Sequence, residues 1–158
     1  MKARTSRNFP VYAAGHLWSV NAVKLTELPD GTQAISQEEL ARIHRGIANA
    51  VCGAGDVLTI EELEFLCDVT DTSFTDVAVF LDLNKSTITM WRKKGQVPSR
   101  MASNTLKRWF WFQIFGDELA GESLPLSGFQ NDEGFLKVAS QRAIRLKATM
   151  PVELKRAS

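Results

Sequence analysis

Apolar residues recur at helical spacing through the middle of the chain. Between residues 36 and 53 they stand three or four positions apart, at Leu40, Ile43, Ile47 and Val51, which predicts an amphipathic helix. Ser36, followed three residues later by Glu39, is typical of the capping box that begins a helix. The same pattern predicts further helices from residues 59, 73, 84 and 98, the last ending near residue 116.

The N-terminal part of the chain has a different pattern. Residues 17–25 and 32–36 are rich in strand-forming residues and flank Pro29-Asp30-Gly31, so we expect a short β-hairpin there. Residues 1–16 are polar and predict a flexible arm. Residues 117–158 are irregular, with a basic end, and predict a C-terminal extension.

Composition places the chain among ordinary soluble proteins. Hydrophobic residues make up 44% and charged residues 23%, and no apolar run has the roughly 18 residues of a membrane-spanning helix. We therefore expect a cytoplasmic protein that does not bind a membrane. The two cysteines, Cys52 and Cys67, form neither a disulfide scaffold nor the paired motifs of a zinc site, so we expect no metal and no cofactor.

The charges change sign along the helical region. Residues 58–82 carry seven acidic and no basic side chains, whereas residues 83–116 carry seven basic and no acidic ones. Such a division can give the molecule one cationic face that attracts a polyanion. The alternative is two ordinary solvated faces.

Residues 74–95 predict a short helix, a three-residue turn and a second short helix. This segment resembles the helix-turn-helix of the phage-repressor-like (Xre) family. The residues that match the family's core positions are Leu66, Ala78, Leu81, Leu83, Ile88, Trp91 and Gly95. The sequence departs from the family at Phe74, where Gln is usual, and at Asp82, where Gly is usual.

Upstream pieces extend the resemblance to about residues 17–115. Leu17-Trp18, then residues 40–48 (LARIHRGIA), then residues 58–66 (LTIEELEFL) are similar to MqsA-type antitoxins and regulators, although the zinc-ribbon half is absent here. The resemblance implies a bacterial, phage or mobile-element origin. It also implies a mainly α fold, with a five-helix lambda-repressor-like helix-turn-helix domain at 58–116 and a small N-terminal β-hairpin. Residues 17–57 would then be a hairpin-plus-helix extension.

The resemblance also implies which residues contact DNA. Those expected to read base edges are Lys85, Ser86, Thr89 and Met90. Those expected to contact phosphates are Thr75, Thr87, Arg92, Lys93, Lys94 and Arg100. The alternative for the cations is that they only complement the C-terminal dipole of their helix.

The last predicted helix has more aromatic surface than one core contact needs. We expect Trp109, Trp111, Phe112 and Phe115 to form a homodimer interface, because two-fold symmetry is the commonest closed assembly. The alternative is that the hairpin or the C-terminal extension covers these side chains within one chain.

Together these patterns predict a transcriptional regulator that binds a specific double-stranded DNA sequence. We expect a dimeric repressor acting on a palindromic operator, and the alternative is an antitoxin that neutralises a protein toxin and represses its own operon. We do not expect an enzyme, because His16 and His44 are the only histidines and neither stands in a triad or metal motif. No stacking motif of the RNA-binding modules is visible.

Overall fold

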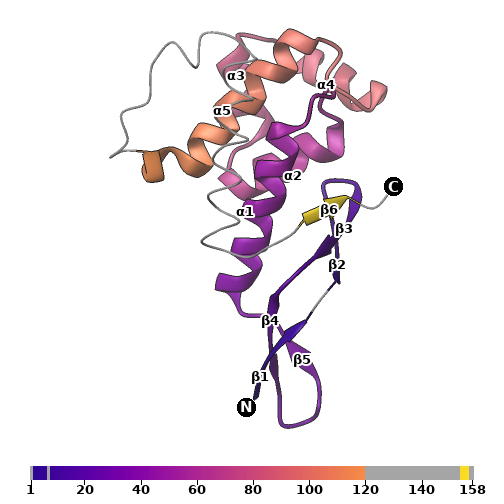
Figure 1. Ribbon diagram of the computed structural model, residues 1–158. Helices are drawn as coiled ribbons and strands as arrows, with labels where there is room; N and C mark the ends of the chain where they lie inside the picture. Colours follow the sequence, from indigo (N-terminus) through magenta and orange to yellow (C-terminus); the bar gives the residue numbers. More distant parts are fainter. Residues whose placement is uncertain (1, 7, 120–153, 157–158) are drawn as a thin grey trace.

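The computed structural model describes residues 2–6, 8–119 and 154–156, and within them the protein is mainly α-helical with small antiparallel sheets at its N-terminal end (Figure 1). The helices are α1 (Gln37–Gly53), α2 (Ile60–Thr70), α3 (Phe74–Leu81), α4 (Lys85–Lys94) and α5 (Arg100–Leu119). The strands are β1 (Lys2–Ser6), β2 (Phe9–Ala13), β3 (His16–Val20), β4 (Val23–Glu27), β5 (Gln33–Ala34) and β6 (Leu154–Arg156). Most of the predicted C-terminal extension lies outside the described residues.

Residues 2–6 and 8–27 form a long β-ribbon. Strand β1 pairs with β4, and β2 pairs with β3. The two pairings keep one register, because Ser6 lies opposite Val23 and Phe9 lies opposite Val20. Asn8 and Ala22 have positive φ angles of 52° and 57° where the ribbon is interrupted. The prediction of a flexible arm at 1–16 was wrong, because this segment pairs with the strands that follow it.

The ribbon turns at Ala14 and Gly15. Both residues have positive φ, 56° and 76°, as the central residues of a type I′ hairpin turn do. A Cβ atom on Gly15 would lie 2.9 Å from the Cβ atom of Glu61 on α2. Glycine is therefore required both by the backbone conformation and by the close packing of this turn against α2.

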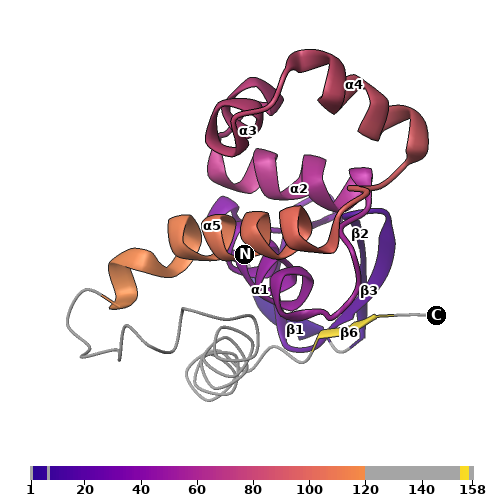
Figure 2. The same cartoon turned by 90° about the horizontal axis from the view of Figure 1, so that it is seen from above.

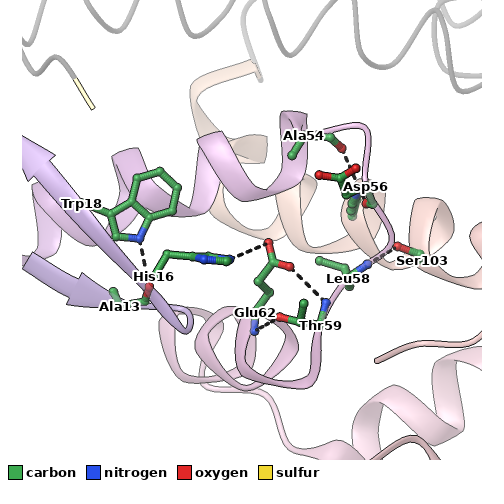
Figure 3. Close-up of polar contacts among 10 residues, drawn as sticks. Ala13, His16, Trp18, Ala54, Asp56, Leu58, Thr59, Glu62 and Ser103 are labelled. Atoms are coloured by element: carbon green, nitrogen blue, oxygen red, sulfur yellow. Dashed lines mark hydrogen bonds and ion pairs between the residues drawn. The ribbon is translucent and has the colours of Figure 1, made fainter. Parts of the chain in front are cut away.

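One polar contact within the ribbon and one between the ribbon and α2 lie at the same end of the ribbon (Figure 3). The indole Nε1 of Trp18 donates to the carbonyl of Ala13 at 2.9 Å, and Nε2 of His16 lies 4.0 Å from a carboxylate oxygen of Glu62. Leu17 and Trp18 both lie in β3, and the Trp18 side chain is buried.

Two further strands complete the sheets. Strand β5 pairs with β4, with Thr26 opposite Ala34, across the turn that contains Pro29-Asp30-Gly31. The predicted hairpin therefore exists, although its first strand is β4 alone and residues 16–20 belong to the other hairpin. Strand β6, from the C-terminal end of the chain, pairs antiparallel with β3.

Helix starts follow the predicted caps with one exception. Ser36 accepts a hydrogen bond from the Glu39 amide, and full capping boxes join Thr59 to Glu62 and Ser73 to Asp76. Asn84 stands at the N-cap of α4 but makes no side-chain capping hydrogen bond.

The core lies where α1, α2 and α5 meet, with the ribbon against α1 and α2. Ile43, Ile47, Leu63 and Leu66 are completely buried there, as the helical spacing predicted for α1 and α2. Within the described residues, none of the helices combines the length and the hydropathy needed to span a bilayer.

A buried lysine fixes the connection between α1 and α2. Lys107 of α5 is only 2% exposed, and its Nζ donates to the carbonyl oxygens of Ala54, at 2.6 Å, and of Asp56. Burial lowers the pKa of this ammonium group. Nearby, the Leu58 amide donates to the Ser103 hydroxyl at 2.9 Å (Figure 3). These contacts stabilise the loop that leads into α2.

Candidate functional site

Helices α3 and α4 form a compact unit on the side of α2 away from α1 (Figure 2). Asp82 ends α3 in the left-handed conformation with φ 54°, and the Leu83 amide donates to the Ala78 carbonyl at 2.8 Å. The turn of residues 82–84 is therefore closed by a backbone hydrogen bond to the last turn of α3. Aspartate adopts the positive φ that this position needs, although glycine would adopt it more readily.

The far end of α4 is held by backbone hydrogen bonds. Gly95 ends the helix with φ 77°, and its carbonyl accepts from the Ile60 amide at 3.0 Å. The Val97 amide then donates to the Leu58 carbonyl at 2.9 Å. The segment after α4 thus runs antiparallel to the start of α2, which fixes the direction of α4 on the core.

One face of α4 packs inward and the other faces solvent. Ile88 and Trp91 are each 4% exposed and pack into the core. The four predicted base-reading residues, Lys85, Ser86, Thr89 and Met90, are all exposed. The structure therefore brings them together on one outer face over two turns of helix.

Thr89 is the most constrained member of this set. Its hydroxyl donates to the Lys85 carbonyl at 3.1 Å, within the helix. A hydroxyl group has one proton and two acceptor lone pairs. In this rotamer Thr89 can therefore accept a hydrogen bond from a partner but cannot donate one.

The residues predicted to contact phosphates are dispersed around this face. Arg92, Lys93 and Lys94 form the exposed last turn of α4, and Thr75 is exposed in the first turn of α3. Thr87 is half-buried. Arg100 donates to the Gly55 carbonyl at 3.4 Å, so it lies against the loop between α1 and α2 and not beside the α4 cations.

A surface groove separates α3 from α4, and sequence reasoning did not identify it. Its α3 wall is formed by Phe74, Thr75 and Ala78, and its α4 wall by Lys85, Ile88, Thr89 and Arg92. The Arg92 guanidinium carbon lies 4.2 Å from the centre of the Phe74 ring, within the range of a cation–π contact. The unusual residue at position 74 is thus in contact with a cation of α4.

Two of the four α5 aromatic residues predicted to form a dimer interface are buried. Trp111 and Phe115 are 0% and 1% exposed. Trp111 Nε1 donates to Asn49 Oδ1 at 3.0 Å, and the Arg45 guanidinium lies 5.3 Å from the centre of the Phe115 ring. The prediction that these two residues form a dimer interface was wrong, because α1 covers them within the same chain.

An apolar surface remains between α3 and α5. Trp109 is half-buried and stacks on Phe80, with ring centres 4.3 Å apart and planes at 8°. Phe80 is 42% exposed and the adjacent Val79 is 76% exposed. Phe112, on α5, is 37% exposed. We call Val79, Phe80 and Trp109 the α3/α5 apolar surface.

In the described part of the chain, the remaining titratable residues form no second candidate site. The described residues contain no group of three His, Cys, Asp or Glu side chains placed to hold a metal ion. Cys52 and Cys67 are buried thiols, and burial raises the pKa of each to about 12. His44 meets the Phe65 ring edge-on, and burial lowers its pKa.

Comparison with known proteins adds no assignment. Protein-family models, curated proteins and solved structures gave no significant match to this chain.

Proposed function

We propose that the protein is a transcriptional regulator that binds double-stranded DNA, with α4 as a recognition helix in the major groove. The observation that carries this proposal is the outer face of α4. It presents Lys85, Ser86, Thr89 and Met90 to solvent, and three cations follow in its last turn. A helix of this size fits the major groove of B-DNA, where residues near its N-terminal end reach base edges.

The charge distribution supports the same proposal. Helix α4 and the turn that follows carry no acidic side chain, whereas α2 exposes Glu61, Glu64 and Asp68. The polyanion would therefore be attracted to the α4 side and repelled from the surface of α2. Lys85 would donate to guanine acceptors, and Lys93 and Lys94 would neutralise phosphates on either side of the groove.

A two-fold assembly would complete the regulator. The α3/α5 apolar surface, with Phe112, replaces the predicted set as the candidate contact with a second copy, because Trp111 and Phe115 are buried. A homodimer would place two copies of α4 about one helical repeat, or 34 Å, apart on a palindromic site. Repression would follow from occupation of that site.

Substitution of Lys85 tests the reading face. We expect Lys85→Ala to cost roughly 1–3 kcal/mol on the preferred sequence and to relax the preference at one base pair. Lys93→Ala should weaken specific and random duplexes alike and should flatten the salt dependence. Both are measured by titrating labelled duplexes selected from random DNA, at stated salt concentrations.

Lys24→Ala is the matched control. Lys24 is exposed on β4, at the opposite end of the molecule from α3 and α4 (Figure 1), so this change should leave both affinities unaltered. If the wild-type protein bound no duplex, or if Lys85→Ala bound every sequence as the wild type does, the proposed reading face would be wrong.

A further inference from the structure

We propose that the groove between α3 and α4 is a binding site for one DNA backbone phosphate, and that Phe74 is the positioning residue that holds Arg92 in it. This inference rests on the proposed function and adds a ligand group, a site and a residue role to it. The Phe74 side chain cannot itself hydrogen-bond a phosphate. The structure shows instead what the Phe74 ring touches.

Arg92 lies against the Phe74 ring at the groove. Its guanidinium carbon lies 4.2 Å from the centre of the Phe74 ring, and both residues line the groove. A guanidinium that covers an aromatic face keeps its in-plane N–H groups directed outward at the ring's edge. Those donors match the paired oxygens of a phosphate.

The other side chains that line the groove also suit a phosphate. Lys85, whose ammonium group is assigned to a base edge, adds positive potential at the groove, and the exposed Thr75 hydroxyl can act as a neutral donor to the phosphate. No acidic residue lines the groove. Two cations and a hydroxyl around a solvent-open groove suit a phosphodiester, which carries a single negative charge and stays largely solvated on a duplex.

Contact with Phe74 restricts the Arg92 side chain before DNA binds. A free arginine side chain loses rotamer entropy when it is immobilised on a ligand. The Phe74 ring removes part of that freedom in advance. The residue therefore acts through Arg92, and its loss should weaken binding of every duplex without changing which bases are preferred.

The alternative is that contact with Phe74 holds Arg92 where it cannot reach DNA. In that case the cation–π contact must break on binding, and removal of the ring would strengthen binding. The two cases differ in sign, so one substitution separates them.

The test is a set of variants titrated with a selected duplex and a random duplex between about 50 and 200 mM salt. We expect Phe74→Leu to weaken both duplexes by about two- to fivefold, the range of an exposed cation–π contact. Phe74→Tyr keeps an aromatic face and should retain wild-type affinity. Arg92→Ala should weaken both duplexes and reduce the slope of log affinity against log salt by about 0.9.

Two measurements separate positioning from simple support of the fold. In the Phe74→Leu background, Arg92→Ala should cost less than it does in the wild type, because the two side chains act together. Phe9→Leu is the matched control, since Phe9 is a half-buried phenylalanine of β2, outside both the α3–turn–α4 unit and the α3/α5 apolar surface. It should leave DNA affinity unchanged, and thermal melting would show that each variant is folded.

The outcomes distinguish this inference from the proposed function. If the wild type binds duplexes and Phe74→Leu binds equally or more tightly, or if its effect adds fully to that of Arg92→Ala, the positioning role is overturned and the DNA-binding function stands. If the wild type binds no duplex at the lowest salt, the proposed function fails and this site fails with it.

Discussion

At the residue scale, burial decides the role of several side chains that the sequence alone leaves open. Trp111 was predicted to lie outside, and its hydrogen bond to Asn49 places it inside. Lys107 was counted among the surface cations, and it caps the end of α1 from within the fold. Such residues are ambiguous in sequence because an aromatic or a lysine can be satisfied either in water or by one long-range partner.

Burial of Cys52 makes the free energy of unfolding sensitive to alkali. Its pKa is raised from 9.0 to about 12 by desolvation, so the folded state keeps the proton where the unfolded state loses it. Its contribution is complete below pH 9 and falls as the pH rises toward 12. We expect the wild type to lose about 1 to 2 kcal/mol by about pH 10 through this group.

Cys52→Ala is the comparison that isolates this effect. The variant should be less stable at neutral pH, because it leaves a cavity, but its alkaline limb should be flatter than that of the wild type. Lys107 and Cys67 titrate in both proteins, so their effects largely cancel in the difference. Urea unfolding between about pH 8 and 10 gives the measurement, and parallel alkaline limbs would contradict it.

At the element scale, local signals predicted the helices well. Spacing, capping residues and glycines gave the order and the approximate ends of all five described helices, and α4 begins and ends where the sequence indicated. The ribbon was missed because its turn is Ala14-Gly15, which lacks the Asn-Gly or Asp-Gly signal of a two-residue hairpin. Its partner strands could not be recognised without that turn.

The caps of α3 and α4 should differ in their contribution to stability. The Ser73 hydroxyl accepts a hydrogen bond from the Asp76 amide and donates one to the Asp76 carboxylate. Ser73→Ala should therefore lower the free energy of unfolding by about 1 kcal/mol. Asn84 makes no side-chain capping bond, so Asn84→Ala should cost much less. Chemical denaturation of the two variants checks this, and equal losses would show that Asn84 caps α4 in solution.

At the scale of the whole molecule, the layers separate the two surfaces to which different roles are proposed. The α4 face lies at the end of the molecule opposite β1, β4 and β5 (Figure 1), while the α3/α5 apolar surface lies to the side of it. An arrangement of this kind leaves the cationic face open when a second copy binds the apolar one. The proposed dimer and the proposed DNA contact are therefore compatible.

Val79 offers a clean test of the dimer. It is 76% exposed, so Val79→Ser should change the stability of the monomer by less than about 0.5 kcal/mol. We expect it to shift a wild-type dimer toward monomer, as measured by sedimentation at micromolar concentration. Leu28→Ser, in the turn between β4 and β5, is the control and should not change the assembly. A wild-type monomer, or an unchanged dimer in the Val79 variant, would contradict the assignment.

The sequence by itself determined the helices, their caps, the α3–turn–α4 unit and the exposed set at Lys85, Ser86, Thr89 and Met90. These features depend on neighbours within a few positions, because helical periodicity fixes which side chains share a face. The tertiary structure alone decided the ribbon register, the burial of Trp111 and Phe115 by α1, and the contact between Arg92 and Phe74. Those features depend on partners far away in the chain, and no local pattern specifies which of many apolar or charged residues will meet.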